Sequence, residues 1–434
     1  MGYLIGVVVF VVGMLLSIAL HEVGHMVPAK RFGVRVSQYM VGFGPTLWSR
    51  TRGETEYGVK AIPLGGYVRL VGMYAPGSGE HRPGRFAEMA QDARDASAEE
   101  ILPGEEHRAF YRLSAGKKVV VMLGGPFMNL LIALVLMGVL VIGVGSVQPT
   151  TTVERVVPCV PATTAGVCAA GDQRSPAAAA GLEPGDRILS YAGTDVDTWS
   201  DVTAAISANG DRPAAVVIER DGARSEVTVQ PQVATRTVVD AAGAPVLDDA
   251  GEPQTVTSAY VGVGPTVEKV RGDLGDTAEA LWTQVTGTAR IVTTLPVQVW
   301  DVGRTLVTGG ERAQDSVMSI VGVGRVAGEV GSADLEGVTT GDRVVIWVSL
   351  LASLNIALFV FNLIPLLPLD GGHVVGALYE GARRQAARLR GRSPLPGPAD
   401  TARMMPLAYG VFVVLIGISA LLIVADLVVP VTLT

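Results

Sequence analysis

Four long apolar segments, separated by polar stretches, dominate the hydrophobic pattern of the chain. A helix needs about 20 mostly apolar residues to cross a bilayer, and each segment is long enough. The pattern therefore predicts transmembrane helices within residues 1–27, 118–147, 344–370 and 405–429. The first segment has no basic residue before its apolar core and no small-residue cleavage site after it, so we interpret it as a retained helix rather than a signal peptide.

The pattern changes in the region between the first two spans, residues 28–117. Residues 36–73 form short runs rich in β-branched and aromatic residues, separated by Gly-Pro, Arg-Gly-Glu and Pro-Leu-Gly-Gly breaks. Such runs are typical of β-hairpins. Residues 75–113 are polar and rich in Pro, Gly, Ala and Glu, which predicts a mobile linker.

Short strand-like runs alternate with two short helices in residues 150–233. The strand-like runs are TTVERVV, RILSYAG and AAVVIER, the helices are expected at about 176–180 and 200–208, and Asp221-Gly222 marks a hairpin turn. This arrangement resembles a PDZ domain of the kind found in bacterial membrane proteases. PDZ domains bind extended peptides by adding them to a sheet edge.

The only two cysteines, Cys159 and Cys168, lie in an apparent insertion of this module. The short loop between them makes a disulfide geometrically feasible, and free thiols are the alternative. Residues 234–343 begin with a second insertion and continue with apolar residues at helical spacing, where charges are too frequent for a membrane span. This stretch predicts amphipathic helices at the outer surface of the membrane, or else a soluble helix that faces a core.

The distribution of charge indicates a chain folded on both sides of a membrane. The net charge is −7, but residues 148–343 carry 26 acidic and 14 basic residues, whereas the rest carries 15 and 20. Basic residues gather in the loops 28–118 and 371–404, so the positive-inside rule places both loops in the cytoplasm and residues 148–343 outside it. The chain shows no basic stripe of the kind that binds nucleic acid.

A chemically informative motif, HEVGH, ends the first apolar segment at residues 21–25. His21 and His25 share one face of a helix, because four residues advance the chain by roughly 400°. Both imidazoles can then bind one Zn²⁺, and Glu22 can act as general base toward a water at the metal. A motif of this length also arises by chance, but ionisable residues in an apolar span are costly, which favours a metal site.

A catalytic zinc needs a third protein ligand, which should come from another membrane segment. Asp370 fits best, because it ends the third apolar run at the same predicted depth as HEVGH. The alternative is a turn or helix-capping aspartate before Gly371-Gly372. The candidates set aside are His81 and His107 in the polar loop, Glu380 in the basic loop and Asp426 near the far end of the last span. His373 is interpreted as an interfacial residue, with an outer-sphere partner of the metal as the alternative.

HEVGH, the LLPLDGG that contains Asp370 and a PDZ-like module between spans together resemble the site-2 protease family, over nearly the whole chain. The most similar branch is the bacterial regulator-of-sigma-E type. The resemblance implies a polytopic α-helical protein of the bacterial cytoplasmic membrane, with a membrane-associated β-hairpin region in the cytoplasm and an extracytoplasmic PDZ domain. It also implies a zinc endopeptidase with Zn²⁺ on His21, His25 and Asp370 and with Glu22 as the catalytic residue.

The same resemblance extends to further positions. Asn362 with Pro365 matches the family motif ahead of its L-D-G, and Asn362 is expected to support the substrate or the transition state, or to bond a neighbouring helix. Gly124-Gly125-Pro126 with Asn129 matches the second-span motif, for which close helix packing and substrate support are both expected. Gly65, Gly66 and Tyr67 match a hairpin that holds the substrate as an added strand. A role for SIVGVGRVAGE, residues 319–329, does not follow from the motif.

The implied substrates are single-span membrane proteins such as anti-sigma factors, already trimmed by an upstream site-1 protease. The single PDZ-like unit suggests a filter that admits trimmed substrates. There are two alternatives to the protease. One is a catalytically silent scaffold that recruits partners through its PDZ domain, and the other is a transporter of ions or protons. A complete set of two His, Glu and Asp argues against the scaffold, and the lack of inverted repeats argues against the transporter.

Overall fold

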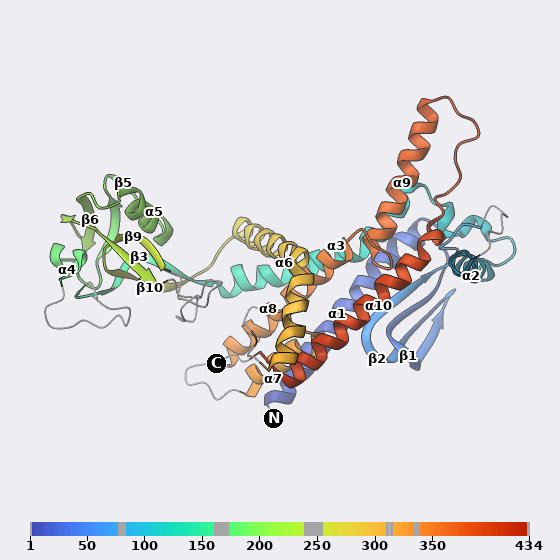
Figure 1. Cartoon of the computed structure of the whole chain (residues 1–434), viewed down its shortest axis with the longest axis horizontal. Coiled ribbons are helices and arrows are strands. Elements are labelled where there is room, and N and C mark those ends of the chain that lie inside the picture. The colour runs from blue at the N-terminus through green and yellow to red at the C-terminus, as the bar shows by residue number, and fades with distance from the viewer. Residues whose placement is uncertain are drawn as a thin grey trace. The chain divides into compact units, whose positions relative to one another are not determined.

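The computed structural model describes residues 2–76, 84–159, 173–237, 255–309, 312, 316–332 and 339–431 (Figure 1). The chain forms two compact units, residues 1–144 with 272–434 and residues 145–271. Within the described residues, four helices are long and apolar enough to cross a membrane: Gly2–Arg31, Ala115–Val144, Thr340–Asn362 and Thr401–Val428. The prediction of four spanning segments is therefore confirmed at the level of helix length and composition.

The third apolar segment is not one helix. Helix α8 (Thr340–Asn362) ends eight residues before Asp370, and turns follow, because prolines at 365 and 368 cannot continue a helix. Helix α9 (Asp370–Leu389) then begins at the candidate metal ligand. The expectation of a loop over residues 371–404 is thus wrong for its first half, where Ala, Arg and Glu favour a helix.

Close contact between α1 (Gly2–Arg31) and α3 (Ala115–Gly138) forms the centre of the larger unit. A Cβ atom added to Gly24 would lie 2.2 Å from the carbonyl oxygen of Gly124, and one added to Gly124 would lie 1.9 Å from that of Gly24. Only glycine permits backbones to approach this closely. Helix α3 continues into a π-helical turn, η3 (Val139–Val144).

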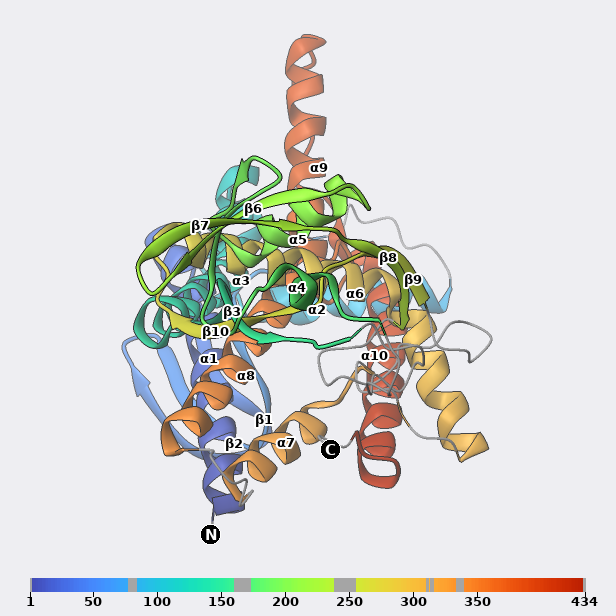
Figure 2. The same cartoon turned by 90° about the vertical axis from the view of Figure 1, so that its left-hand side faces the viewer.

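Helix α7 (Ile320–Ser332) contains the segment whose role the sequence left open. It packs on the first half of α1, where Gly331 and Ala327 meet Gly2 and Gly6 through backbone atoms. Figure 2 shows α7 running between the N-terminal end of α1 and the last helix, α10 (Met405–Val428). The segment therefore connects helices rather than contributing to the metal site.

The predicted hairpin region forms a single long hairpin of β1 (Val36–Arg52) and β2 (Thr55–Leu70), as Figure 1 shows. Both strands fold back on themselves, so residues 38–41 pair with residues 56–59 on one side and with residues 66–69 on the other. Residues 66–70 thus form an edge whose outer side pairs with no strand in the described part of the chain.

The expected mobile linker over residues 75–113 contains a 15-residue helix instead, α2 (Arg85–Glu99), followed by the 3-10 turns η1 (Glu106–Arg108) and η2 (Phe110–Arg112). The linker prediction is wrong there because the segment RFAEMAQDARDASAE consists largely of good helix formers. Tertiary contacts hold it, since the Tyr74 backbone N–H donates to Ser97 Oγ at 3.0 Å. His81 lies outside the described residues.

The smaller unit contains a sheet in the order β10-β3-β4-β6-β7, with β5 beside β4. Its core gathers apolar residues from both helices and several strands, including Val153, Ile188, Tyr191, Val202 and Ile218. The predicted elements are present as β3 (Ser146–Val156), α4 (Pro176–Ala180), β4 (Arg187–Tyr191), α5 (Trp199–Asn209), β6 (Ala214–Arg220) and β7 (Ala223–Val229). The short strand β5 (Thr194–Asp195) was not predicted.

The predicted end of this module at residue 233 is too early. Strand β10 (Val263–Val270) pairs antiparallel with β3, and the hairpin of β8 (Gln232–Thr237) and β9 (Thr255–Tyr260) precedes it. The first strand therefore finds its partner more than a hundred residues later, a pairing that local patterns do not reveal. Cys159 is disulfide-bonded, and Cys168 lies outside the described residues.

A buried ion pair stabilises the smaller unit. The Asp186 side chain is fully buried and accepts hydrogen bonds from Arg220 Nε at 2.6 Å and from the Glu183 backbone N–H at 2.8 Å. Burial alone would raise the pKa of Asp186, but these hydrogen bonds hold it below its usual value. The carboxylate therefore remains charged at neutral pH.

Helix α6 (Leu274–Thr308) is a single 35-residue helix where several amphipathic helices were expected. Asp273 caps its start, accepting from the Asp276 N–H at 3.0 Å. One face packs against α3 and α8 through Leu281, Val285 and Val292, whereas Trp282 and Trp300 are exposed. The helix prediction is confirmed, and its location at a membrane surface stays a prediction.

Candidate active site

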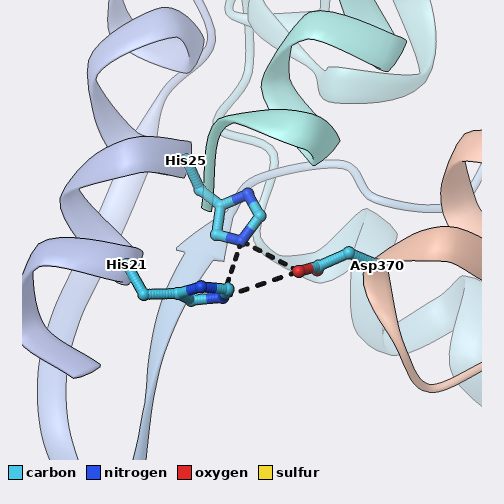
Figure 3. Close-up of side chains that lie close together, drawn as sticks. All are labelled: His21, His25 and Asp370. Atoms are coloured by element: carbon cyan, nitrogen blue, oxygen red, sulfur yellow. Dashed lines mark hydrogen bonds and ion pairs between the residues drawn. The ribbon is translucent and has the colours of Figure 1, made fainter. Parts of the chain in front are cut away.

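The candidate metal ligands come from two helices that are distant in sequence (Figure 3). His21 and His25 project from the same side of α1, and Asp370 is the first residue of α9. The Nε2 atoms of the two histidines are 3.2 Å apart. Asp370 Oδ2 lies 3.5 Å from Nε2 of His21 and 3.3 Å from Nε2 of His25. The structure thus brings together the three residues that the sequence singled out.

The dimensions of this triangle fit a zinc ion. A tetrahedral zinc with bonds of about 2.0–2.1 Å keeps its ligands roughly 3.3–3.4 Å apart, which matches the three separations. Among the described residues, these are the His, Cys, Asp and Glu side chains that converge as a metal-binding group. Asp370 Oδ2 is also buried without a hydrogen-bond partner. A buried carboxylate oxygen normally has a partner, so the vacancy in its bonding fits a cation.

The hydrogen bond made by His25 Nδ1 determines which ring nitrogen carries the proton. Nδ1 lies 2.8 Å from the carbonyl oxygen of Val121, which can only accept a hydrogen bond. Nδ1 therefore carries the proton and donates it, and this leaves the Nε2 lone pair free to face Asp370.

Asn129 holds His21 in the corresponding way. Its side chain is fully buried and its amide lies 3.0 Å from His21 Nδ1, while its Oδ1 has no partner. Turning the amide by 180° would place Oδ1 as the acceptor of an Nδ1–H donor and satisfy both groups. Asn129, expected to support the substrate, contacts the candidate metal ligand His21, and this contact favours an orienting role.

Glu22 lies between the metal ligands and the free edge of the hairpin. It is buried, and its carboxylate is within hydrogen-bonding reach of the Val68 backbone. A Cβ atom added to Gly66 would lie 3.1 Å from Glu22 Cγ. The edge formed by residues 66–70 therefore runs directly past the candidate general base.

Two glycines of the second-span motif leave room for the histidines. A Cβ atom on Gly125 would lie 2.2 Å from His25 Nε2, and Gly124 forms the close contact with Gly24. Pro28 lacks the N–H that would bond the Gly24 carbonyl within α1, which leaves that carbonyl free to face α3. The expectation that this motif permits close helix packing is confirmed, and the packing lies beside the two histidines.

Two acidic residues that were set aside as metal ligands have partners elsewhere. Glu380 on α9 accepts from Lys118 Nζ of α3 at 2.7 Å, and both side chains are buried. Asp426 of α10 pairs with Arg312 at 2.6 Å. The Lys118–Glu380 pair ties α9 to α3 and so helps to fix Asp370 relative to the histidines. In the sequence, the position of Lys118 at the start of a predicted span could have indicated a buried ion pair. Nothing in the sequence identified Glu380 as its partner.

The other predicted residues that the structure describes are not part of the metal-binding group. Asn362 is the last residue of α8 and is half-buried, and His373 lies in the first turn of α9. Tyr67 donates its hydroxyl proton to Gln38 Oε1 at 3.2 Å within the hairpin, and Gly65 precedes Gly66 in β2. His107 belongs to η1 and is not in the metal-binding group.

Two grooves adjoin these elements. One of about 560 Å³ follows residues 67–70 on the free hairpin edge and is closed on its other side by Ala93, Ser97 and Met405. The second, of about 290 Å³, belongs to the smaller unit and lies between α5 and residues 258–265, the segment that leads into β10. Each groove therefore runs beside a strand that can accept an extended peptide.

Helices that can span a membrane, with a zinc-binding triad and a buried glutamate beside it, define the class of membrane-embedded zinc metalloproteases. The chain belongs to peptidase family M50, the site-2 protease family, whose model matches residues 9–394. Over all of both chains it is 35% identical to "Zinc metalloprotease Rip1" of Mycobacterium tuberculosis. It is 34% identical to the Rip1 protein of Mycolicibacterium smegmatis, covering 99% of this chain and 98% of that one. "Metalloprotease MmpA" of Caulobacter vibrioides is 27% identical over 89% of each chain.

Proposed function

We propose that this zinc metalloprotease cleaves a peptide bond within the transmembrane segment of single-span membrane proteins, in particular anti-sigma factors that a first protease has already trimmed. The observation that carries the proposal is the position of Glu22, between the zinc ligands and the free hairpin edge, on a helix that can span a membrane. A base, a metal and a strand-accepting edge thus adjoin one another at the end of a candidate span.

Each of these residues has a separate role in hydrolysis of the peptide bond. When bound, zinc supplies a Lewis acid that polarises the scissile carbonyl and increases the acidity of a water. Glu22 takes the proton from the attacking water and returns it to the leaving amine. Val121 keeps His25, and Asn129 keeps His21, in the tautomer that presents Nε2. Asn362 is our candidate for a polar side chain that stabilises the developing negative charge on the carbonyl oxygen.

The substrate enters the site as an extended strand. A helix hides its peptide bonds from attack, so the segment to be cut must unwind first. We propose that it adds to the edge at residues 66–70, with Gly65, Gly66 and Tyr67 beside the scissile bond and the 560 Å³ groove receiving the chain that continues past the cut. Gly66 has no side chain, and this allows the edge strand to pass close to Glu22, since a Cβ atom there would lie 3.1 Å from Glu22 Cγ.

We further propose that the smaller unit is an extracytoplasmic PDZ domain and that the HEVGH end of α1 faces the cytoplasm. The acidic charge of residues 148–343 and the basic loops support this orientation. The groove between α5 and β10 supports a peptide site, because β10 is an edge strand of its sheet. A substrate shortened by a first protease would present its new end to this groove.

The first experiment tests the reaction. The wild type and Glu22→Gln are each co-expressed with a panel of single-span anti-sigma factors whose outer parts have been removed. We expect a cut inside one substrate span that falls by about 10²–10⁴-fold in Glu22→Gln while bound zinc stays the same. Glu99→Gln, an exposed glutamate on α2, is the matched control. Equal cleavage by Glu22→Gln would refute the proposed base.

The second experiment tests the filter. Thr203→Trp fills the groove of the smaller unit, whereas Ala204→Trp places the same bulk on an exposed neighbouring position of α5. We expect Thr203→Trp to slow cleavage of trimmed substrate and Ala204→Trp to leave it unchanged. The filter hypothesis fails if the wild type cuts untrimmed substrate as fast as trimmed substrate.

A further inference from the structure

A third groove, of about 430 Å³, lies between α1 and α3 and belongs to neither of the peptide grooves. Its lining is apolar throughout and consists of Val23, Gly24, Val27, Pro28, Val119, Val120, Leu123, Gly124, Phe127 and Met128. Val27, Val120 and Phe127 are 57%, 51% and 60% exposed, so the groove opens on the outside of the helix pair. In a protein that crosses a membrane, such a surface faces lipid.

The groove is separate from the metal site, because α3 presents different faces to the two. Val121, Gly125 and Asn129 are buried and contact the histidines. Val120 and Leu123 occupy intervening positions of the same helix and line the groove. The two sites share only the glycine contact between α1 and α3.

One end of the groove is basic. On α1, Arg31 follows Val27 and Pro28 by four and three residues, so it lies on the same face of the helix. On α3, Lys117 precedes Val120 by three residues and shares its face in the same way. Both cations therefore continue the helix faces that line the groove. Lys117 Nζ lies 5.3 Å from the ring centroid of Phe32, which brings the ends of the two helices together. Arg31 and Lys117 are exposed, and neither forms an ion pair within the described part of the chain.

We propose that this groove binds an anionic phospholipid, with one acyl chain along the apolar lining and the phosphate group between Arg31 and Lys117. A wholly apolar groove with two cations at one end matches an amphipathic ligand that has a hydrocarbon tail and an anionic head. Basic pockets between transmembrane helices bind such headgroups. A packed protein helix in the groove would leave both cations without an anion.

The position of the groove links its occupancy to the metal site. Its floor is the Gly24–Gly124 contact, and His25, whose Nδ1 donates to Val121, is the next residue of α1. A lipid that fills the groove braces the two helices where the histidines are positioned. The lipid therefore acts as a structural ligand and not as a substrate.

The test measures lipid retention, which does not depend on proteolytic activity. The full-length protein, purified in a mild detergent, is mixed with dioleoyl-phosphatidylglycerol or dioleoyl-phosphatidylcholine and analysed by native mass spectrometry. We expect the wild type to retain the anionic lipid in preference to the zwitterionic one. Arg31→Gln with Lys117→Gln should weaken retention of phosphatidylglycerol by roughly 30-fold, about fivefold for each charge. Arg388→Gln with Arg390→Gln removes the same charge from the C-terminal end of α9 and its capping residue, and should leave retention unchanged.

A second pair of variants tests the apolar part. Leu123→Trp fills the groove and should reduce retention of both lipids, whereas Val135→Trp, on an exposed part of α3 outside the groove, should not. Equal retention of the two lipids by the wild type would overturn the proposal, as would an unchanged preference in the double glutamine variant. A wild-type dimer that Leu123→Trp dissociates would identify a second copy of the chain as the occupant instead.

Discussion

Two clusters of ionisable side chains in this protein look alike in sequence and differ in structure. Asp370 faces two histidines near the end of α1, and its Oδ2 has no hydrogen-bond donor. Asp426, near the end of α10, is fully engaged: Arg312 Nη1 donates to Oδ1 at 2.6 Å, and the Ser319 backbone N–H donates to Oδ2 at 2.6 Å. Both carboxylates are in or beside apolar helices, where an uncompensated charge is costly.

The difference separates a ligand site from a structural ion pair. Arg312 also donates to the Val317 carbonyl at 2.5 Å, and through these bonds the pair joins the end of α10 to the start of α7. Each carboxylate oxygen of Asp426 thus already accepts a hydrogen bond from the protein. At Asp370 the protein supplies two imidazole lone pairs and a carboxylate oxygen, but no proton donor. An ionisable residue in a membrane helix thus indicates a functional site only when its bonding is incomplete.

The largest effect on zinc is expected from loss of a ligand. Asp370→Ala leaves two histidines, too few to hold a catalytic zinc, so the metal content of the purified protein should fall to background and cleavage should cease. Asp426→Asn is the matched control and should keep its zinc. Elemental analysis of the two proteins measures this directly, and a full zinc complement in Asp370→Ala would contradict the ligand set.

A smaller effect is expected from the residue that orients His21. Asn129→Leu removes the acceptor for Nδ1–H and should weaken zinc binding by about 10–100-fold, measured by competition with a chelator. Asn129→Asp keeps an acceptor oxygen and should bind zinc much more tightly than Asn129→Leu. If the two variants lost zinc equally, the side chain would serve packing rather than orientation.

The structural pair should affect stability without affecting zinc affinity. Asp426→Ala leaves Arg312 buried without its partner, which should lower the free energy of unfolding by about 3–5 kcal/mol. Replacing both, as Arg312→Met with Asp426→Leu, should recover most of that loss. Denaturant unfolding in detergent compares the variants, and zinc-binding measurements on the folded protein should show no change. A double variant as unstable as Asp426→Ala would argue against the pair as the cause.

Much of the site was predictable because its residues can be recognised from short stretches of sequence. His21 and His25 need only helical spacing, and Asp370 is identified by ending an apolar run at a matching depth. The strands and helices of residues 150–233 follow from turn residues and alternation in the same way. Asn129 could be assigned to a motif, but its contact with His21 depends on how α3 packs against α1.

Longer-range features were not predictable from local patterns. The partners in Lys118–Glu380 and Arg312–Asp426 are distant in the chain, and nothing near either residue specifies the other. Strand β10 joins β3 across most of the smaller unit. Helices α2 and α9 are polar segments whose composition also fits loops, and tertiary contacts such as Tyr74 with Ser97 stabilise them.

The division of the zinc ligands between α1 and α9 has a consequence for biosynthesis. HEVGH is synthesised before the smaller unit and α8, whereas Asp370 follows only after both have been made. Until then the chain holds two ligands of three and cannot assemble a catalytic zinc site. With these three ligands, a copy whose synthesis stops before Asp370 is expected to lack proteolytic activity.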